Sequence, residues 1–205
     1  MNKKERFALF LGMLCGDGCL SIKHNGEGYR VYPIQFCSGK QSEVELFAYL
    51  FKKIFGIEGR VSSRTREGRK EIWGFLKHSR KIFEYLRDFG CPEGKKKYTL
   101  KVPTSIFNSS KIEKKLFILG FAICDGYFNK SNGIMLHLGT KRFIEDLNLL
   151  ISSIIGYKKE IKECKQNGKY SSYQLYLNKA EKELILSDMP RWDNGTPSVL
   201  RGFPK

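Results

Sequence analysis

The stretch LGMLCGDG at residues 11–18 returns as LGFAICDG at residues 119–126, so that Asp17 is repeated 108 residues later as Asp125. Leu, Gly, Asp and Gly coincide in the two copies, and the positions between them carry mainly apolar residues. A repeat of this kind determines the architecture of the whole chain, because each copy is expected to fold in the same way. The sequence therefore predicts two related halves.

The order of local patterns after each motif supports the duplication. An apolar helix at 4–15 is followed by extended segments at 20–24 and 29–38, a helix at 42–55, a hairpin at 60–66 and 70–76, and a helix at 79–89. The second half repeats this order with extended segments at 127–130 and 134–138, a helix at 142–155, a hairpin at 158–165 and 170–177, and a helix at 179–186. Gly56 and Gly156 end equivalent helices.

These patterns predict an α+β fold made of two pseudo-symmetric αββαββα repeats. We expect the amino-terminal repeat at 1–90, a joining segment at 91–111, the carboxy-terminal repeat at 112–189 and an irregular tail at 190–205. The joining segment and the tail contain most of the prolines, which favour irregular structure.

The composition indicates a polyanionic partner. The chain has 205 residues, of which 41% are apolar, so it can bury a sizeable core and is not a disordered protein. Lysine and arginine number 37 against 21 acidic residues, giving a formal net charge of +16. A surplus of this size favours nucleic acid first and an anionic membrane second.

The cysteines and the amino terminus exclude two other classes. The six cysteines form no C-x-x-C pair, which argues against a zinc site and against a disulfide framework. Basic residues before the apolar run at 7–16 resemble a signal peptide, but the same apolar pattern returns in mid-chain. We therefore expect an intracellular protein with reduced thiols.

The two motifs suggest a metal site between paired helices. Gly12 and Gly120 lie in mid-helix, where glycine costs about 0.5–1 kcal/mol relative to alanine, so we expect the two helices to pack closely there. Such a pair brings Asp17 and Asp125 together at the helix ends. Two adjacent carboxylates repel each other unless a cation lies between them, and Mg²⁺ prefers such oxygen ligands.

The motifs 11–18 and 119–126 resemble the two copies of the LAGLIDADG motif of homing endonucleases. The run-up to the second motif, from Gly94 to Pro103, is also similar to that family. The resemblance covers nearly the whole chain and implies a monomer whose two antiparallel sheets form a saddle over the major groove of DNA. It also implies Mg²⁺ or Mn²⁺ as the cofactor and cleavage of both strands, one per active-site half, with short 3′ overhangs.

The resemblance assigns roles to individual residues. Asp17 and Asp125 match the metal-binding acids, helped by the carbonyls of Gly16 and Cys124. Lys40 and Lys141 match the lysine that activates water or stabilises the scissile phosphate. This chain departs from the family in lacking the glutamine before that lysine, and in having Cys15 and Ile123 at the sixth motif position.

Base and phosphate contacts are expected on the strands. Three arginines and a serine alternate in one strand at 60–66 with no acid among them, which places them on one face. The predicted DNA-binding residues are Lys23, Arg30, Gln35, Arg60, Ser62, Arg64, Arg66, Arg69, Lys130, Lys162, Ser172, Gln174 and Tyr176.

The sequence thus predicts a site-specific, metal-dependent endonuclease acting on a long, nearly non-palindromic DNA site. One alternative is an RNA-binding maturase that assists intron splicing on the same scaffold. A second alternative is a non-catalytic DNA-binding regulator. The intact Asp17 and Asp125 weigh against both, because neither function needs the paired carboxylates.

Overall fold

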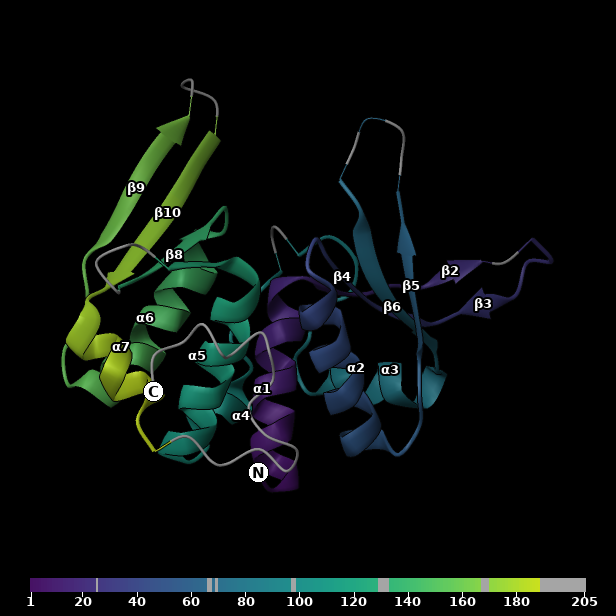
Figure 1. Ribbon diagram of the computed structural model, residues 1–205, viewed down its shortest axis with the longest axis horizontal. Coiled ribbons are helices and arrows are strands. Elements are labelled where there is room, and N and C mark those ends of the chain that lie inside the picture. The colour runs from purple at the N-terminus through teal and green to yellow at the C-terminus, as the bar shows by residue number, and fades with distance from the viewer. Residues whose placement is uncertain are drawn as a thin grey trace.

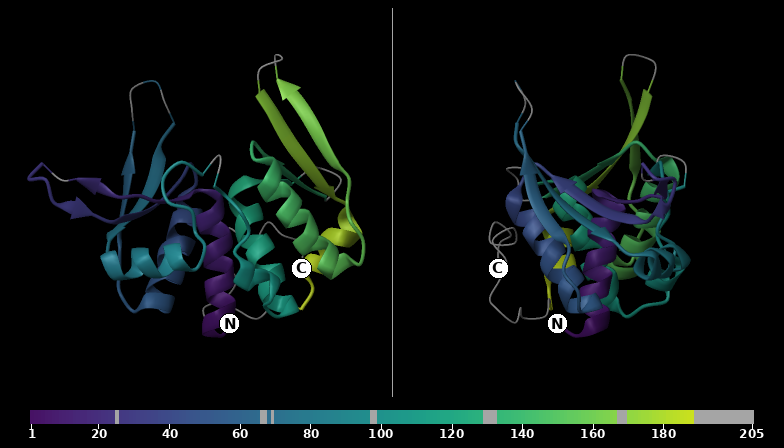
Figure 2. Two further views of the ribbon diagram at one scale, coloured as in Figure 1. Left: turned by 180° about the vertical axis from the view of Figure 1, so that it is seen from behind. Right: turned by 90° about the vertical axis from the view of Figure 1, so that its right-hand side faces the viewer.

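The computed structural model describes residues 1–24, 26–65, 68, 70–96, 99–128, 133–166 and 170–188. It forms two similar halves that meet at a central pair of helices (Figure 1). Each half has a four-stranded antiparallel sheet with helices on one face and an open face on the other (Figures 1 and 2). The α+β fold of two pseudo-symmetric repeats is confirmed.

The first half begins with the central helix α1. Its elements are α1 (Lys3–Gly16), β1 (Gly18–Leu20), β2 (Lys23–His24), β3 (Arg30–Val31), β4 (Pro33–Ser38), α2 (Gln41–Phe55), β5 (Arg60–Arg64), β6 (Ile72–His78) and α3 (Arg80–Asp88). The sheet has the strand order β1-β4-β6-β5. The short helix α4 (Thr104–Phe107) lies in the joining segment.

The second half repeats this topology. Its elements are α5 (Lys111–Asp125), β7 (Gly126–Phe128), β8 (Ile134–Leu138), α6 (Lys141–Ile155), β9 (Ile161–Gln166), β10 (Tyr170–Leu177) and α7 (Lys179–Leu186). The strand order β7-β8-β10-β9 corresponds position by position to that of the first sheet. The hairpins β5–β6 and β9–β10 rise on opposite sides of the molecule, which gives the open face its saddle shape (Figures 1 and 2).

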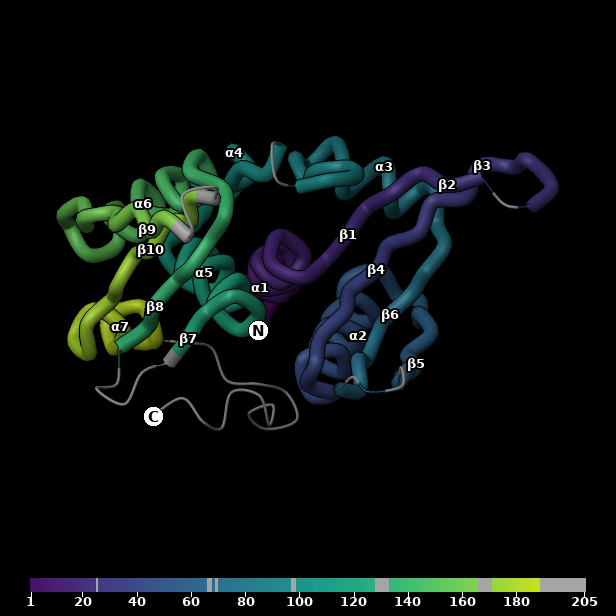
Figure 3. The backbone as a smooth tube through the Cα atoms, turned by 90° about the horizontal axis from the view of Figure 1, so that it is seen from above, coloured from purple at the N-terminus to yellow at the C-terminus, as the bar shows by residue number. Residues whose placement is uncertain are grey.

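The halves differ in the segment between motif and second helix. Gln41 follows Asp17 by 24 positions, whereas Lys141 follows Asp125 by 16. The additional eight residues belong to the excursion that contains β2 and β3. This small hairpin points away from the first sheet, at the far end of the molecule from α5 (Figure 3). The described part of the second half contains no equivalent hairpin.

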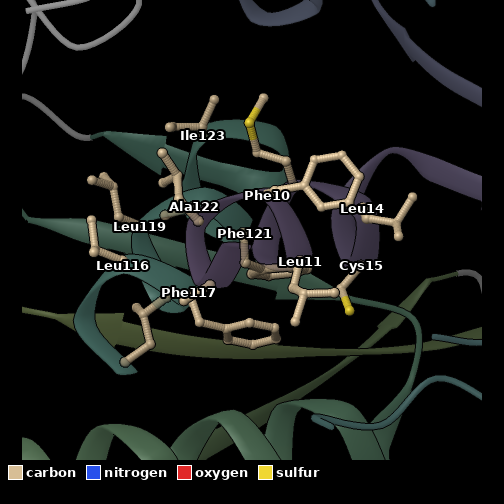
Figure 4. Close-up of a cluster of buried hydrophobic side chains, with 14 of the residues drawn as sticks. Phe10, Leu11, Leu14, Cys15, Leu116, Phe117, Leu119, Phe121, Ala122 and Ile123 are labelled. Atoms are coloured by element: carbon tan, nitrogen blue, oxygen red, sulfur yellow. The ribbon is translucent and has the colours of Figure 1, made fainter. Parts of the chain in front are cut away.

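The central helices pack as closely as the glycines predict. A Cβ atom on Gly12 would lie 2.1 Å from the carbonyl oxygen of Phe117, and one on Gly120 would lie 2.2 Å from that of Leu9. No side chain fits at such distances, so these two positions bring the α1 and α5 backbones into contact. Apolar side chains of both helices surround the crossing, and residues 8–15 of α1 are all buried (Figure 4).

One continuous core extends from this crossing into both halves, with a different composition in each. The first is rich in aromatic rings, with Phe47 of α2 stacked on Phe36 and packed against Phe10 and Phe75. The second is mainly aliphatic, and Leu147, Leu150 and Ile151 of α6 are fully buried in it. No helix in the described ranges is long and apolar enough to cross a membrane.

Candidate active site

The two motif aspartates meet where α1 and α5 end. Asp17 caps the carboxyl end of α1, and Asp125 is the last residue of α5. The intervening Gly16 is pressed against the other helix, since a Cβ atom there would lie 2.6 Å from the Cβ of Cys124 and 3.5 Å from Oδ2 of Asp125. The pairing of the carboxylates follows from the close helix crossing.

Burial and neighbouring negative charges favour the protonated forms of these acids. Burial, followed by the charge of Asp125, raises the pKa of Asp17 to about 6. Burial also raises the pKa of Asp125, and the charge of Glu43 adds to this effect. A site that penalises two negative charges in this way favours a bound cation.

A lysine of the joining segment supplies one positive charge at this site. Lys96 Nζ donates hydrogen bonds to the carbonyl oxygens of Leu14 at 3.1 Å, Cys15 at 3.0 Å and Gly16 at 2.5 Å. These are the unpaired carbonyls at the end of α1, where the helix dipole attracts a cation. The same charge lowers the pKa of both Asp17 and Asp125.

Lys96 was not among the residues predicted from the sequence. The run of three lysines at 95–97 indicated a basic segment, but a charge run gives no information on which member turns inward. In the structure Lys95 is exposed, whereas Lys96 is half-buried. Only the packing of the joining segment across α1 distinguishes the two.

A second network surrounds Lys40, which lies between β4 and α2. Its Nζ donates to Oε1 of Glu43 at 2.8 Å, while Ser38 Oγ donates to Oε2 of the same carboxylate. Glu43 is buried on the first turn of α2, close enough to the centre for its charge to raise the pKa of both aspartates. No sequence signal marks this role, because glutamate is common in the first turn of any helix.

Lys141 does not occupy the place of Lys40. Lys40 is the N-cap of α2, and the N-cap of α6 is Thr140, so that Lys141 corresponds to Gln41. Lys141 is exposed, and its charge is not among those that shift the pKa of Asp125. The catalytic role of Lys141 remains a prediction. Lys141 lies one residue further along the second half than Lys40 does along the first.

The predicted metal ligands supply hard oxygen donors. Asp17 and Asp125 offer carboxylates, and Gly16 offers a carbonyl that Lys96 already contacts. Burial raises the pKa of the Cys124 thiol well above its ordinary value, so only the carbonyl of that residue suits a hard cation. No group of three or more acidic, histidine or cysteine side chains in the described ranges is arranged to hold a metal ion.

The open face of the first sheet carries the predicted arginines. Arg60, Ser62 and Arg64 pair with Leu76, Gly74 and Ile72 of β6. They lie on the face of the sheet opposite to the one that carries the buried Phe36 and Phe75. Gln35 pairs with Leu76 and lies on the same face. Lys23 and Arg30 are exposed on the β2–β3 hairpin, while Arg66 and Arg69 lie outside the described residues.

The open face of the second sheet is less charged. Gln174 pairs with His137 and Lys162, and Ser172 and Tyr176 share its side of β10. His137 and Tyr127 are exposed on this face and are not among the predicted residues. In β8, Ile134, Leu136 and Leu138 are buried at every second position, and this alternation could have indicated that His137 faces outward. Lys130 lies outside the described residues.

Comparisons with known proteins agree with this geometry. A family model described as LAGLIDADG-like domain matches residues 113–189. A subunit of the A-type ATP synthase of Pyrococcus abyssi (strain GE5 / Orsay) is 30% identical over 130 residues, which is 63% of this chain. The match spans only 11% of the length of that ATP synthase protein.

Solved structures match over most of the chain. Mesophilic variants of the homing endonuclease I-DmoI have a TM-score of 0.70 at 16% identity, covering 93% of this chain and 95% of that one. I-DmoI in complex with DNA and Mn has a TM-score of 0.67 at 16% identity, covering 92% and 100%. I-WcaI bound to its DNA recognition sequence has a TM-score of 0.57 at 15% identity, covering 90% and 80%. At these identities the likeness establishes the fold.

Proposed function

We propose that this chain, which has the two-motif, single-chain LAGLIDADG homing-endonuclease fold, is a site-specific endonuclease. It would hydrolyse both strands of double-stranded DNA with a divalent metal ion. The observation that carries the proposal is the pair of half-buried aspartates at the joint ends of α1 and α5, below the open faces of two sheets. The similar fold of I-DmoI in complex with DNA and Mn, and of I-WcaI bound to its DNA recognition sequence, supports it.

The carboxylates fit a hard divalent cation. Asp17 and Asp125 would hold it, with backbone carbonyls, water and the DNA phosphate completing the coordination, because Mg²⁺ keeps several ligands of this kind. When bound, Mg²⁺ or Mn²⁺ stabilises the negative charge on the attacking and leaving oxygens. Without a bound metal ion, the raised pKa of Asp17, about 6, means that its ionised form dominates only above that pH.

The lysines around the pair supply positive charge for the phosphate. Lys40 has its ammonium near Asp17, where it would orient the attacking water or the scissile phosphate. Lys141 would serve the other half from the first turn of α6. Hydrolysis forms a bond between the water oxygen and phosphorus and breaks one ester bond, so a nearby ammonium stabilises the charge that develops.

The two open sheet faces would lie in the major groove of one DNA duplex. Polar and basic side chains on both faces can contact base edges, while exposed lysines and arginines contact phosphates. Because the two faces carry different residues, the preferred site is expected to be long and nearly non-palindromic. A single chain contains both halves, so we propose that the active form is an intracellular monomer.

The decisive experiment is selection of cleaved sites from a randomised DNA library. The protein is incubated with the library and Mg²⁺, and the cut ends are sequenced. We expect one long consensus, cut on both strands with a short 3′ overhang. Cleavage without any consensus would contradict site specificity, and a lack of cleavage with Mg²⁺ or Mn²⁺ would contradict the nuclease function.

A further inference from the structure

Glu43 is a buried carboxylate beside the site to which the proposed hydrolysis gives no role. Its side chain is 3% exposed, and its charge raises the pKa of both motif aspartates. Burying a third negative charge near two others is costly unless it has a specific partner. Glu43 has two such partners.

The partners fix the conformation of Lys40. Glu43 Oε1 accepts from Lys40 Nζ at 2.8 Å, and Oε2 accepts from Ser38 Oγ at 2.5 Å. The oxygen of the same Ser38 hydroxyl accepts from the backbone N–H of Lys40 at 3.1 Å. Both the main chain and the ammonium of Lys40 are therefore held by one closed network.

This restraint matters because Lys40 is otherwise free to move. Its side chain is 71% exposed, and an exposed lysine samples many rotamers. The network lies in the half of Asp17, because Lys40 follows β4, and β4 pairs with β1 directly after Asp17, with Phe36 opposite Gly18. Asp125 is followed instead by β7, which pairs with β8. The lysine thus belongs to the half that contains Asp17.

The second half has no equivalent network among its described residues. Leu138 and Phe143 stand where the first half has Ser38 and Glu43, and Thr140 stands at the place of Lys40. Within the described ranges no ion pair holds Lys141. The two halves therefore differ in how their lysine is held.

We propose that Glu43 is a positioning residue that holds the Lys40 ammonium beside Asp17, so that cleavage of one DNA strand depends on Glu43 and cleavage of the other does not. This rests on the proposed function, since it assumes that each half serves one strand. Glu43 acts through Lys40 and does not touch the DNA.

The test measures the two strand cleavages separately. A duplex containing the selected site carries a different label on each strand, and kcat and KM are determined with Mg²⁺ for each label. Glu43→Gln keeps the size of the side chain and removes its charge. We expect kcat for one strand to fall about 10–100-fold, as for other residues that orient a catalytic group, with KM and the other strand little changed.

Matched variants separate positioning from a merely structural role. Glu45→Gln makes the same chemical change on an exposed glutamate of the same helix and should leave both strands as in the wild type. In a Lys40→Met background, Glu43→Gln should add less than about a twofold effect, because its action passes through the lysine.

Equal slowing of both strands, no slowing of either, or a full effect in the Lys40→Met background would each overturn the inference. If Glu43→Gln does not fold, Ser38→Ala takes its place, since it removes only the hydroxyl that donates to Oε2. We expect about a 3–10-fold loss on the same single strand. Failure of the wild type to cut either strand would overturn the proposed function instead, so the two outcomes are distinguishable.

Discussion

The two halves of the molecule share a topology but not a chemistry. Their sheets have the same strand order, and their central helices cross at equivalent glycines. Around the aspartate pair, however, the first half supplies Glu43 and Lys40, whereas the second places apolar Leu138 and Phe143 at positions corresponding to Ser38 and Glu43. The repeat therefore determines the backbone, while each half has its own electrostatics.

The same contrast holds on the open faces. Strand β5 presents Arg60 and Arg64, and the β2–β3 hairpin adds Lys23 and Arg30. Strand β9 occupies the position of β5 and presents Lys162 and Cys164 on its open face, beside the neutral Gln174 and Tyr176 of β10. A duplicated fold with unlike faces is suited to an asymmetric partner, because each half can recognise a different sequence.

The shared feature, the helix crossing, should be the most sensitive to mutation. Gly12→Leu and Gly120→Leu each place a side chain where a Cβ atom already lies about 2 Å from a carbonyl oxygen. We expect each to lower the free energy of unfolding by more than about 3 kcal/mol, beyond ordinary overpacking. Thermal unfolding of the two variants measures this.

Gly39→Ala and Gly139→Ala are the matched controls for the crossing. Neither residue has an atom within 4 Å of an added Cβ, so their melting temperatures should stay close to that of the wild type. If Gly12→Leu melts like these controls, the helices do not cross at that residue. A large effect of only one leucine variant would show that the crossing is not symmetric.

The ends of the two central helices should respond differently to loss of a lysine. Lys96→Met removes three hydrogen bonds from a charged donor to the end of α1, whereas no described lysine bonds to the end of α5. We expect a loss of about 2 kcal/mol in the free energy of unfolding without metal, measured by urea denaturation. Lys95→Met, on an exposed neighbour, should cost less than about 0.5 kcal/mol.

The two open faces should differ in how they recognise bases. A bidentate contact from arginine to guanine contributes about 1–3 kcal/mol of discrimination, so Arg64→Ala should relax preference at one or two base pairs. Gln174→Ala should relax preference at the opposite end of the site. Cleavage of every single-base variant measures both, and a uniform loss over all variants would mean that the residue reads no sequence.

The smallest expected effect concerns the stability cost of the aspartate pair. Because Asp17 has a pKa of about 6 when folded and 3.8 as its ordinary value, the folded protein retains a proton that the unfolded chain has lost. The stability of the metal-free protein should therefore fall as pH rises from about 4 to 6. Asp17→Asn should reduce this fall to the part that comes from the raised pKa of Asp125.

At pH 7 we expect Asp17→Asn to be more stable than the wild type by about 1 kcal/mol, after allowing for the partial exposure of the side chain. Below pH 4 the two should be equal. Added Mg²⁺ should stabilise the wild type more than the variant, since the ligand binds only the folded site. A stability difference between Asp17→Asn and the wild type that does not grow between pH 4 and 6 would contradict the raised pKa of Asp17.

The repeat allowed much of this structure to be predicted. The order of elements, the crossing at Gly12 and Gly120, and the meeting of Asp17 with Asp125 all follow from two aligned motifs and the periodicity after them. These features depend on the backbone, which the hydrophobic pattern specifies.

The residues that differ between the halves could not be predicted in this way. Lys96 acts through contacts with residues about 80 positions away, and no local pattern marks such a contact. Glu43 becomes part of the site only because α2 begins beside the ends of α1 and α5. The predicted correspondence between Lys40 and Lys141 is one residue out of register. Each lysine lies near the start of a helix, but the sequence does not show that Lys40 is the N-cap of α2 whereas Lys141 follows the N-cap of α6.

The central claim is that one active centre needs both motif aspartates, and its direct test is cleavage and binding by Asp17→Asn and Asp125→Asn. Both variants keep the shape of the site, so specific binding of the selected DNA should be largely unchanged. We predict that each variant loses double-strand cleavage in Mg²⁺. Full double-strand cleavage by either variant would contradict the account.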